Sequence, residues 1–259
     1  MEKHGTIVYL EDVTVNFDGF RALRGVNFYV DHGELRALIG PNGAGKTTLL
    51  DAICGKVKPE RGRIIFGAMT DLTTLEEHEI AALGVGRKFQ TPAVFKNLTL
   101  FENLTLSLPH QWDIVSTLFG SLAPQQTDRI VSTLETLGLL EKAHQKAAAL
   151  SHGEMQWLEI GMVMVQDPQL FLLDEPVAGM TGEEREKTGE LLKRMAMDRA
   201  VLVVEHDMEF VRQTAQKVTV LHEGMILCEG SVEKVQRDPR VVEVYLGRGY
   251  HADAHDSRH

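Results

Sequence analysis

Long apolar runs are absent from the sequence. No stretch approaches the roughly 18–20 uninterrupted apolar residues that a helix needs to span a bilayer. The first residues, Met1 to Gly5, lack the apolar centre of a signal peptide. Hydrophobic residues make up 43% of the chain and charged residues 25%, as in an ordinary soluble globular protein. We therefore expect a protein that stays in the cytosol.

Cysteine and net positive charge are also scarce. The only two cysteines, Cys54 and Cys228, have neither metal-binding nor redox spacing, so they fit a reducing compartment and small core positions. The formal net charge is −10, whereas nucleic-acid binders usually show a basic balance or a basic patch. No nucleic-acid partner is expected, but this charge does not exclude a nucleotide ligand.

One glycine-rich stretch fits the phosphate-binding loop pattern G-x-x-x-x-G-K-[ST]. Its residues are Gly40, Pro41, Asn42, Gly43, Ala44, Gly45, Lys46, Thr47 and Thr48. Glycines allow backbone N–H groups to point at a phosphate chain, Lys46 adds a positive charge, and the Thr47 hydroxyl can bind Mg²⁺. An apolar strand over residues 35–39 and a helix over residues 46–53 are predicted to flank the loop. A helix that begins at a phosphate site directs its positive end toward the anion. The loop therefore predicts ATP and Mg²⁺ as ligands.

The segments around this loop alternate between strand and helix patterns. Residues 6–17 and 26–30 are rich in β-branched and aromatic residues, and a turn at Asp18-Gly19 lies between them. Residues 170–173 and 201–204 are apolar at every position, as in strands that are covered on both faces of a parallel sheet. A helix over residues 183–197 is predicted to connect these two strands. The pattern predicts a doubly wound α/β sheet that binds its ligand beyond the carboxyl ends of the strands.

Strand patterns disappear in the middle of the chain. Apolar residues in residues 127–140 follow a largely helical spacing. We expect one domain over residues 1–250, with a helical subdomain at about 91–165 inserted into it. Residues 251–259 form a polar tail with three histidines that is expected to be disordered rather than to bind a metal.

A pair of acidic residues follows the apolar run at 170–173. Asp174 is placed to hold Mg²⁺ from the side opposite Thr47, and Glu175 is placed to polarise the attacking water as general base. A pair that only caps a strand is the alternative, which the phosphate-binding loop makes less favourable. His206 follows the second apolar run at the same sheet edge.

The order of these motifs resembles that of the ABC ATPases over residues 6–247. Residues 150–154, Leu-Ser-His-Gly-Glu, are similar to the family's L-S-G-G-Q signature, and we call them the signature segment. Residues 177–180, Val-Ala-Gly-Met, occupy the position of the family's D-loop. The resemblance also places Gln90 in the Q-loop, His206 as the switch histidine and Phe17 as the aromatic that stacks on adenine. It implies a P-loop ATPase core with a mainly parallel sheet, an N-terminal antiparallel β subdomain and an inserted helical subdomain.

The resemblance further implies a head-to-tail pair of ATPase domains with two nucleotides between them. Ser151 and Gly153 would contact the γ-phosphate bound to the partner subunit, since a hydroxyl, an N–H group and a helix N-terminus form an anion site. Gln90 would touch Mg²⁺ or the attacking water, and His206 would hydrogen-bond the γ-phosphate. The sequence departs from the usual signature at His152 and Glu154. A negative charge at Glu154 is unfavourable near phosphate unless it points away or is paired.

A narrower resemblance concerns the importer to which such a subunit belongs. Residues 150–162, 175–181 and 241–247 look like the ATPase subunit of urea-type importers, which are related to branched-chain amino-acid importers. This implies ATP hydrolysis coupled to import of urea or a related small amide, with branched-chain amino acids as the alternative. The implied partners are inner-membrane permeases, a second ATPase subunit and a periplasmic solute-binding protein. The chain would then sit at the cytoplasmic face of the membrane. A homodimer of the isolated chain is the alternative to a heterodimer with the second ATPase subunit.

Two functions of other classes remain to be separated from an importer subunit. One is an ABC ATPase without transport, such as a partner in Fe–S assembly. The other is a nucleotide-sensing module without hydrolysis, which the presence of Lys46, Asp174, Glu175 and His206 disfavours. For an importer subunit, Val94, Phe95, Leu98 and Phe101 are candidate contacts to the permease, with a place in the subdomain core as the alternative.

Overall fold

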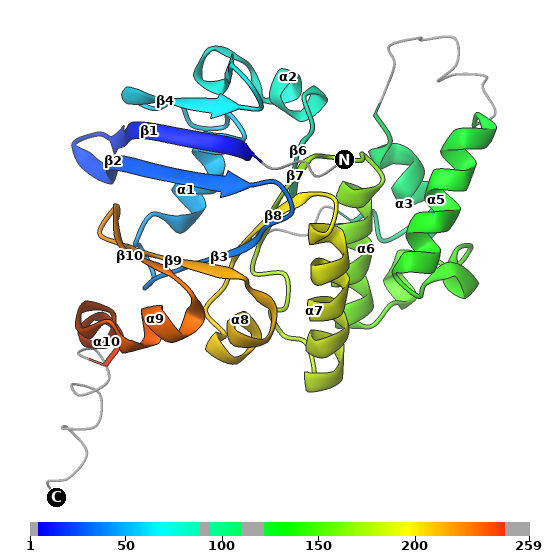
Figure 1. Cartoon of the computed structure of the whole chain (residues 1–259). Helices are drawn as coiled ribbons and strands as arrows, with labels where there is room; N and C mark the ends of the chain where they lie inside the picture. Colours follow the sequence, from blue (N-terminus) through cyan, green and yellow to red (C-terminus); the bar gives the residue numbers. More distant parts are fainter. Residues whose placement is uncertain (1–4, 89–93, 110–121, 247–259) are drawn as a thin grey trace, which may run out of the picture.

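A computed structural model describes residues 5–88, 94–109 and 122–246 of the chain. Two β-sheets and a group of helices make up the described part (Figure 1). The smaller sheet is antiparallel and has the strand order β2-β1-β4-β5. Its strands are β1 (Thr6–Phe17), β2 (Phe20–Asp31), β4 (Arg61–Phe66) and β5 (Thr70–Asp71).

The larger sheet contains the strands whose carboxyl ends lead into the predicted site residues. Its order is β10-β9-β3-β8-β7-β6, and all neighbours are parallel except β9 and β10. The strands are β3 (Leu35–Ile39), β6 (Val85–Lys88), β7 (Leu170–Asp174), β8 (Ala200–Val204), β9 (Lys217–His222) and β10 (Met225–Gly230). Every residue of β3, β7 and β8 is buried, as their unbroken apolar runs predict.

Helices cover both faces of the larger sheet. Their bounds are α1 (Lys46–Ile53), α2 (Glu77–Ala82), α3 (Leu100–Ser107), α5 (Pro124–Thr136), α6 (His152–Met164), α7 (Gly182–Ala196), α8 (Met208–Thr214), α9 (Val232–Arg237) and α10 (Pro239–Leu246). Short 3₁₀ turns are η1 (Leu72–Thr74), η2 (Leu140–Lys142) and η3 (Ala147–Ala149). Helix α1 shares a core with the antiparallel sheet and with Leu172 and Leu202 of the larger sheet. On the opposite face, Phe171 and Val203 pack with α3, α5, α6 and α7.

The predicted fold class is confirmed. The helices α3, α5 and α6 occupy the stretch in which strand patterns disappear, and they lie to one side of the sheets in Figure 1. The strands β5, β6, β9 and β10 were not foreseen, because they are short or lack an unbroken apolar run. The domain limits at residue 250 and at about 91–165 remain a prediction. Within the described residues, no helix is both long enough and apolar enough to cross a membrane.

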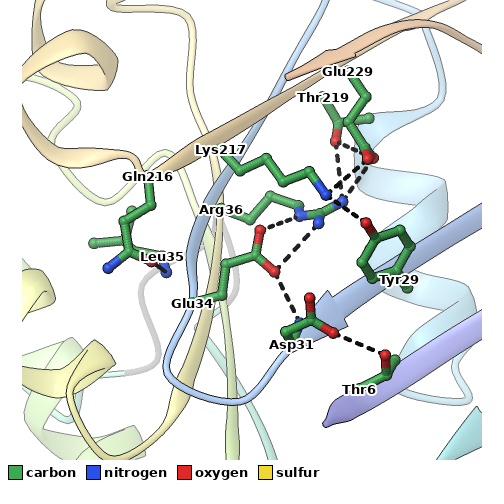
Figure 2. Close-up of polar contacts among 10 residues, drawn as sticks. All are labelled: Thr6, Tyr29, Asp31, Glu34, Leu35, Arg36, Gln216, Lys217, Thr219 and Glu229. Carbon is green, nitrogen blue, oxygen red and sulfur yellow. Dashed lines mark hydrogen bonds and ion pairs between the residues drawn. The ribbon is translucent and has the colours of Figure 1, made fainter. Parts of the chain in front are cut away.

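A buried polar network joins the two sheets at the start of β3 (Figure 2). The guanidinium of Arg36 is fully buried and contacts Glu34 at 2.8 Å and Glu229 at 2.7 Å. It also lies over the ring of Tyr29 on β2, whose hydroxyl accepts a hydrogen bond from Lys217. A buried arginine is tolerated only when its charge is paired and hydrogen-bonded, and both conditions hold here. The network fixes the antiparallel sheet against β3, the strand that leads into the phosphate-binding loop.

Candidate nucleotide-binding site

A cavity of about 480 Å³ lies at the carboxyl ends of β3, β7 and β8. It brings together segments that are far apart in the sequence. The lining residues come from the β1–β2 hairpin, the phosphate-binding loop and the ends of β7 and β8: Phe17, Phe20, Ala22, Asn42, Gly43, Ala44, Gly45, Lys46, Thr47, Thr48, Asp174, Glu175 and Val204. Residues 42–48 of the phosphate-binding loop and Asp174 therefore face one space, as expected at the carboxyl edge of a parallel sheet, whereas Gly40 and Pro41 do not line it.

The backbone of the phosphate-binding loop requires glycine at two positions. Gly45 has φ +103°, and a Cβ there would lie 2.5 Å from the carbonyl oxygen of Ala22. A Cβ on Gly40 would lie 2.1 Å from the carbonyl oxygen of Leu221. Gly45 is the N-cap of α1, so no side chain caps the first N–H groups of that helix. These N–H groups can serve an anion instead.

The Lys46 ammonium lies against the loop itself. Its Nζ donates hydrogen bonds to the carbonyl oxygens of Gly40 at 2.7 Å and Pro41 at 3.1 Å. Burial lowers the pKa of Lys46, although the nearby charges of Glu175 and Asp174 oppose this shift. The cation is thus held beside the loop and next to two carboxylates.

Thr47 and Asp174 both line the cavity and are hydrogen-bonded to each other. The hydroxyl of Thr47 donates to Oδ2 of Asp174 at 3.3 Å. Burial raises the pKa of the Asp174 carboxyl, while Arg87 and the Thr47 hydrogen bond oppose the shift. A hydroxyl and a carboxylate oxygen at this separation fit Mg²⁺, which accepts oxygen ligands and keeps part of its shell for phosphate or water. No group of three or more His, Cys, Asp or Glu side chains in the described residues could hold a metal. Mg²⁺ at this position would therefore share its shell with the nucleotide.

Glu175 sits directly after β7 in an unusual backbone conformation. Its φ is +48°, which is uncommon for a residue with a Cβ. Its N–H donates to the carbonyl oxygen of Val204, which fixes the residue to the end of β8. Nδ1 of His206 lies 3.8 Å from Oε1 of Glu175, and 67% of the His206 side chain is exposed. The structure therefore brings together the two residues predicted to act on the γ-phosphate and the water.

Glu205 connects the loops that carry these two residues. Its buried carboxylate accepts hydrogen bonds from the N–H groups of Val177 and His206. Burial raises the pKa of the Glu205 carboxyl, and the two backbone hydrogen bonds oppose the shift. This positioning role was not predicted. The sequence did contain one indication of it, because Glu205 stands between the apolar run at residues 201–204 and the site residue His206.

Phe17 and Phe20 form the outer wall of the cavity. They are opposite each other across the two-residue turn of the β1–β2 hairpin, so both rings leave the same face of the sheet. Both line the cavity and both are exposed, Phe20 by 61%. The sequence pointed only to Phe17; the symmetry of the pair about Asp18-Gly19 would have indicated Phe20 as well.

The signature segment lies outside this cavity, at the N-terminus of α6. Ser151 is the N-cap of the helix: its hydroxyl accepts from the N–H of Glu154, and the Glu154 carboxylate accepts from the N–H of Ser151. The same carboxylate lies 2.5 Å from Nζ of Lys142. Partial burial raises the pKa of Glu154, but the hydrogen bonds from Lys142 and Ser151 outweigh it, so the pKa lies below its usual value. The charge at Glu154 is therefore paired within the chain.

Gly153 and His152 face the start of α7 and the D-loop. A Cβ on Gly153 would lie 2.2 Å from Oε1 of Glu184, so a side chain there would displace the Glu184 carboxylate from its present place. Nε2 of His152 lies 3.0 Å from the carbonyl oxygen of Ala178. Gln90, the predicted Q-loop residue, lies outside the described residues.

Comparisons with known proteins give matches to family models and to curated relatives. A family model described as "ABC transporter" matches residues 23–178, and one described as "Branched-chain amino acid ATP-binding cassette transporter" matches residues 225–251. The "High-affinity branched-chain amino acid transport ATP-binding protein LivG" of Escherichia coli K12 is 33% identical over 252 residues, which cover 93% of this chain and 98% of LivG. The corresponding protein BraF of Pseudomonas aeruginosa is 32% identical, with coverage of 93% and 98%.

Solved structures give the same result. A nucleotide-free ATP-binding cassette from an ABC transporter matches with a TM-score of 0.83 and 30% identity, over 93% of this chain and 99% of the cassette. A dimeric cassette in a post-hydrolysis state, bound to ADP and Pi, matches with a TM-score of 0.72 and 25% identity, over 87% and 99%.

Proposed function

The chain belongs to the ABC transporter family of ATP-hydrolysing subunits, and we propose that it drives an importer of branched-chain amino acids. The observation that carries the catalytic part is the convergence of Lys46, Thr47, Asp174 and Glu175 on one cavity. The solute rests on the likeness to LivG and BraF and on the family match at residues 225–251.

Each residue of the cavity has a distinct part in the proposed hydrolysis. Lys46 and the loop N–H groups bind the β- and γ-phosphates, and Phe17 stacks on adenine. Thr47 and Asp174 would hold Mg²⁺, whose charge would neutralise the phosphate oxygens. Glu175 accepts a proton from the attacking water, and His206 donates a hydrogen bond to the γ-phosphate. Gln90 completes this set only by resemblance.

The signature segment supplies the remaining wall of a partner's site. The Ser151 hydroxyl and the Gly153 N–H at the start of α6 suit a γ-phosphate that is bound to another ATPase subunit. Because Lys142 pairs with Glu154, the changed signature brings no unpaired negative charge to that phosphate. The partner is proposed to be a different ATPase subunit, so that the two composite sites are not equivalent.

The proposed complex also contains permeases and a periplasmic solute-binding protein, which would hold this chain at the cytoplasmic face of the membrane. The exposed ring of Phe95 is a candidate contact to a permease, whereas Val94 and Phe101 pack against the core. Urea is the second candidate solute. It is favoured by the resemblance of residues 150–162 to urea-type importers, but the overall likeness to LivG supports branched-chain amino acids better.

The test is solute-stimulated ATP turnover in the assembled importer, reconstituted with its permeases, partner ATPase and solute-binding protein. Leucine, isoleucine or valine is expected to stimulate turnover, and urea or acetamide is not. The Glu175→Gln complex serves as the control for background hydrolysis. Stimulation by urea alone would replace the solute while leaving the ATPase role intact. Failure of the chain to join any permease complex would overturn the importer role.

A further inference from the structure

His152 bridges two segments that face a partner subunit in the proposed dimer. Its ring comes from the signature segment, and its Nε2 lies 3.0 Å from the carbonyl oxygen of Ala178 in the D-loop. A carbonyl oxygen only accepts, so Nε2 carries the proton and donates. The bond spans 26 residues of sequence and joins the N-terminus of α6 to the loop that follows β7.

The backbone of the D-loop is shaped to receive this ring. Gly179 has φ +72°, a backbone conformation that residues with a side chain rarely adopt. A Cβ there would lie 2.8 Å from Nε2 of His152. The absence of a side chain at Gly179 thus allows the imidazole to lie against the loop. His152 stands where the usual signature has a glycine. The D-loop residue that its ring lies against, Gly179, is itself a glycine.

The D-loop is in turn attached to the residue that activates water. The N–H of Ala178 donates to the carbonyl oxygen of Glu175 at 3.3 Å, and the N–H of Val177 donates to Glu205. A second connection runs through α7. Trp157 of α6 donates to the hydroxyl of Thr188, and that hydroxyl contacts the sulfur of Met180 at 3.2 Å. The signature helix is therefore linked to the D-loop directly at Ala178 and, through Thr188, at Met180.

We propose that His152 is a positioning residue that couples the signature segment to Glu175 within the same subunit. When Ser151 and Gly153 engage the partner's nucleotide, the His152 bond places the D-loop and hence Glu175 for hydrolysis of this subunit's own nucleotide. The inference rests on the proposed role of the signature segment toward a partner's γ-phosphate. It assigns to this chain a link between the two composite sites.

Two substitutions separate the hydrogen bond from the bulk of the side chain. In His152→Gln, the amide nitrogen is as many bonds from Cα as Nε2 is, so it can reach Ala178. In His152→Asn, the amide nitrogen is one bond closer to Cα and falls short. His152 is exposed, so neither change disturbs the core. Gly179→Ala provides a third variant, in which a methyl group on the D-loop of the same chain displaces the unchanged His152 ring.

The first measurement is hydrogen exchange of D-loop amides in the nucleotide-free full chain. We expect His152→Asn and Gly179→Ala to raise exchange at residues 178–181, and His152→Gln to restore the wild-type rate. The second measurement is ATP turnover in the assembled importer. His152→Asn is expected to lower kcat about two- to tenfold, the range that one neutral hydrogen bond supplies, with KM for ATP unchanged.

The outcomes separate this coupling from the ATPase assignment itself. Wild-type exchange and wild-type kcat in His152→Asn would overturn the coupling, provided that Glu175→Gln is inactive in the same complex. Faster exchange with an unchanged kcat would also overturn it, because the bond would then serve only local structure. An equal loss of kcat in His152→Gln and His152→Asn would show that the hydrogen bond is not responsible. Undiminished turnover in Glu175→Gln would instead contradict the proposed mechanism.

Discussion

The ammonium of Lys88 lies 3.1 Å from Oε2 of Glu159, and the two side chains are only 3% and 5% exposed. Lys88 ends β6 and Glu159 lies in the middle of α6, so the pair joins the large sheet to the signature helix. Removing one partner leaves an uncompensated buried charge, which costs about 3–5 kcal/mol. We expect Lys88→Met to lower the free energy of unfolding by that amount in equilibrium denaturant titrations.

The double variant Lys88→Met/Glu159→Leu tests whether the cost comes from the orphaned charge. It should recover most of the lost stability, since a buried ion pair can be replaced by apolar residues at little cost. Lys187→Met is the matched control: its pair with Glu183 is exposed and is worth less than about 1 kcal/mol. If Lys88→Met and Lys187→Met have the same stability, the buried pair does not hold α6 to the sheet.

Glu175 is expected to determine the rate of hydrolysis without determining nucleotide affinity. Loss of a general base typically slows a reaction about 10²- to 10⁴-fold, so Glu175→Gln should bind ATP normally and release phosphate slowly. His206→Ala should also reduce hydrolysis, since His206 lies beside Glu175 at the cavity edge. Phosphate release and binding of a fluorescent ATP analogue would be measured on the same preparations. The exposed Glu183→Gln variant is the control, and wild-type turnover in Glu175→Gln would remove its role as base.

The phosphate-binding loop and the buried strands could be predicted because their information is local. Lys46 and Thr47 follow a fixed spacing, and the unbroken apolar runs before Asp174 and His206 predict strands that end at one sheet edge. Parallel strands then bring these ends together without further knowledge of packing.

Contacts between distant segments could not be predicted in this way. Lys142 neutralises Glu154 only because a 3₁₀ turn places it beside the start of α6, and nothing in the spacing of twelve residues indicates this. Likewise, the carboxylate of Glu205 gains its role from the N–H of Val177, a residue on another loop. The paired state of Glu154 and the bridging role of Glu205 therefore depend on tertiary structure.

Phe17 and Phe20 are expected to share the contact with adenine. Each ring lines the outer wall of the cavity, and stacking contributes about 0.5–1.5 kcal/mol beyond the area buried. Phe17→Ala and Phe20→Ala should each weaken ATP binding by about three- to tenfold, with little effect on kcat at saturating ATP. Tyr9→Ala is the control, because this exposed ring on β1 does not line the cavity. Unchanged affinity in Phe20→Ala would limit the adenine contact to Phe17.

The pairing of Glu154 with Lys142 predicts a specific dependence of stability on pH. The pKa of Glu154 is lower in the folded chain than its usual value of 4.5, so its ionised form stabilises the fold. That stabilisation is fully present above the unfolded-state pKa and is lost as the pH falls through the lower folded-state pKa. Glu154→Gln keeps the hydrogen bond to the N–H of Ser151 but loses the charge. We expect it to be less stable than wild type by less than about 1 kcal/mol at neutral pH, and equally stable at acid pH.

Denaturant titrations of both proteins at pH 7 and at a pH below the folded-state pKa of Glu154 would measure this difference. Lys142→Met should reproduce the loss at neutral pH, and the double variant should lose no more than either single variant, because all three remove the same pair. Glu154→Gln also restores the usual signature residue, and its turnover in the assembled importer should stay within about threefold of wild type, since Lys142 already offsets the charge. A stability difference that is the same at both pH values would mean that the ion pair makes no contribution.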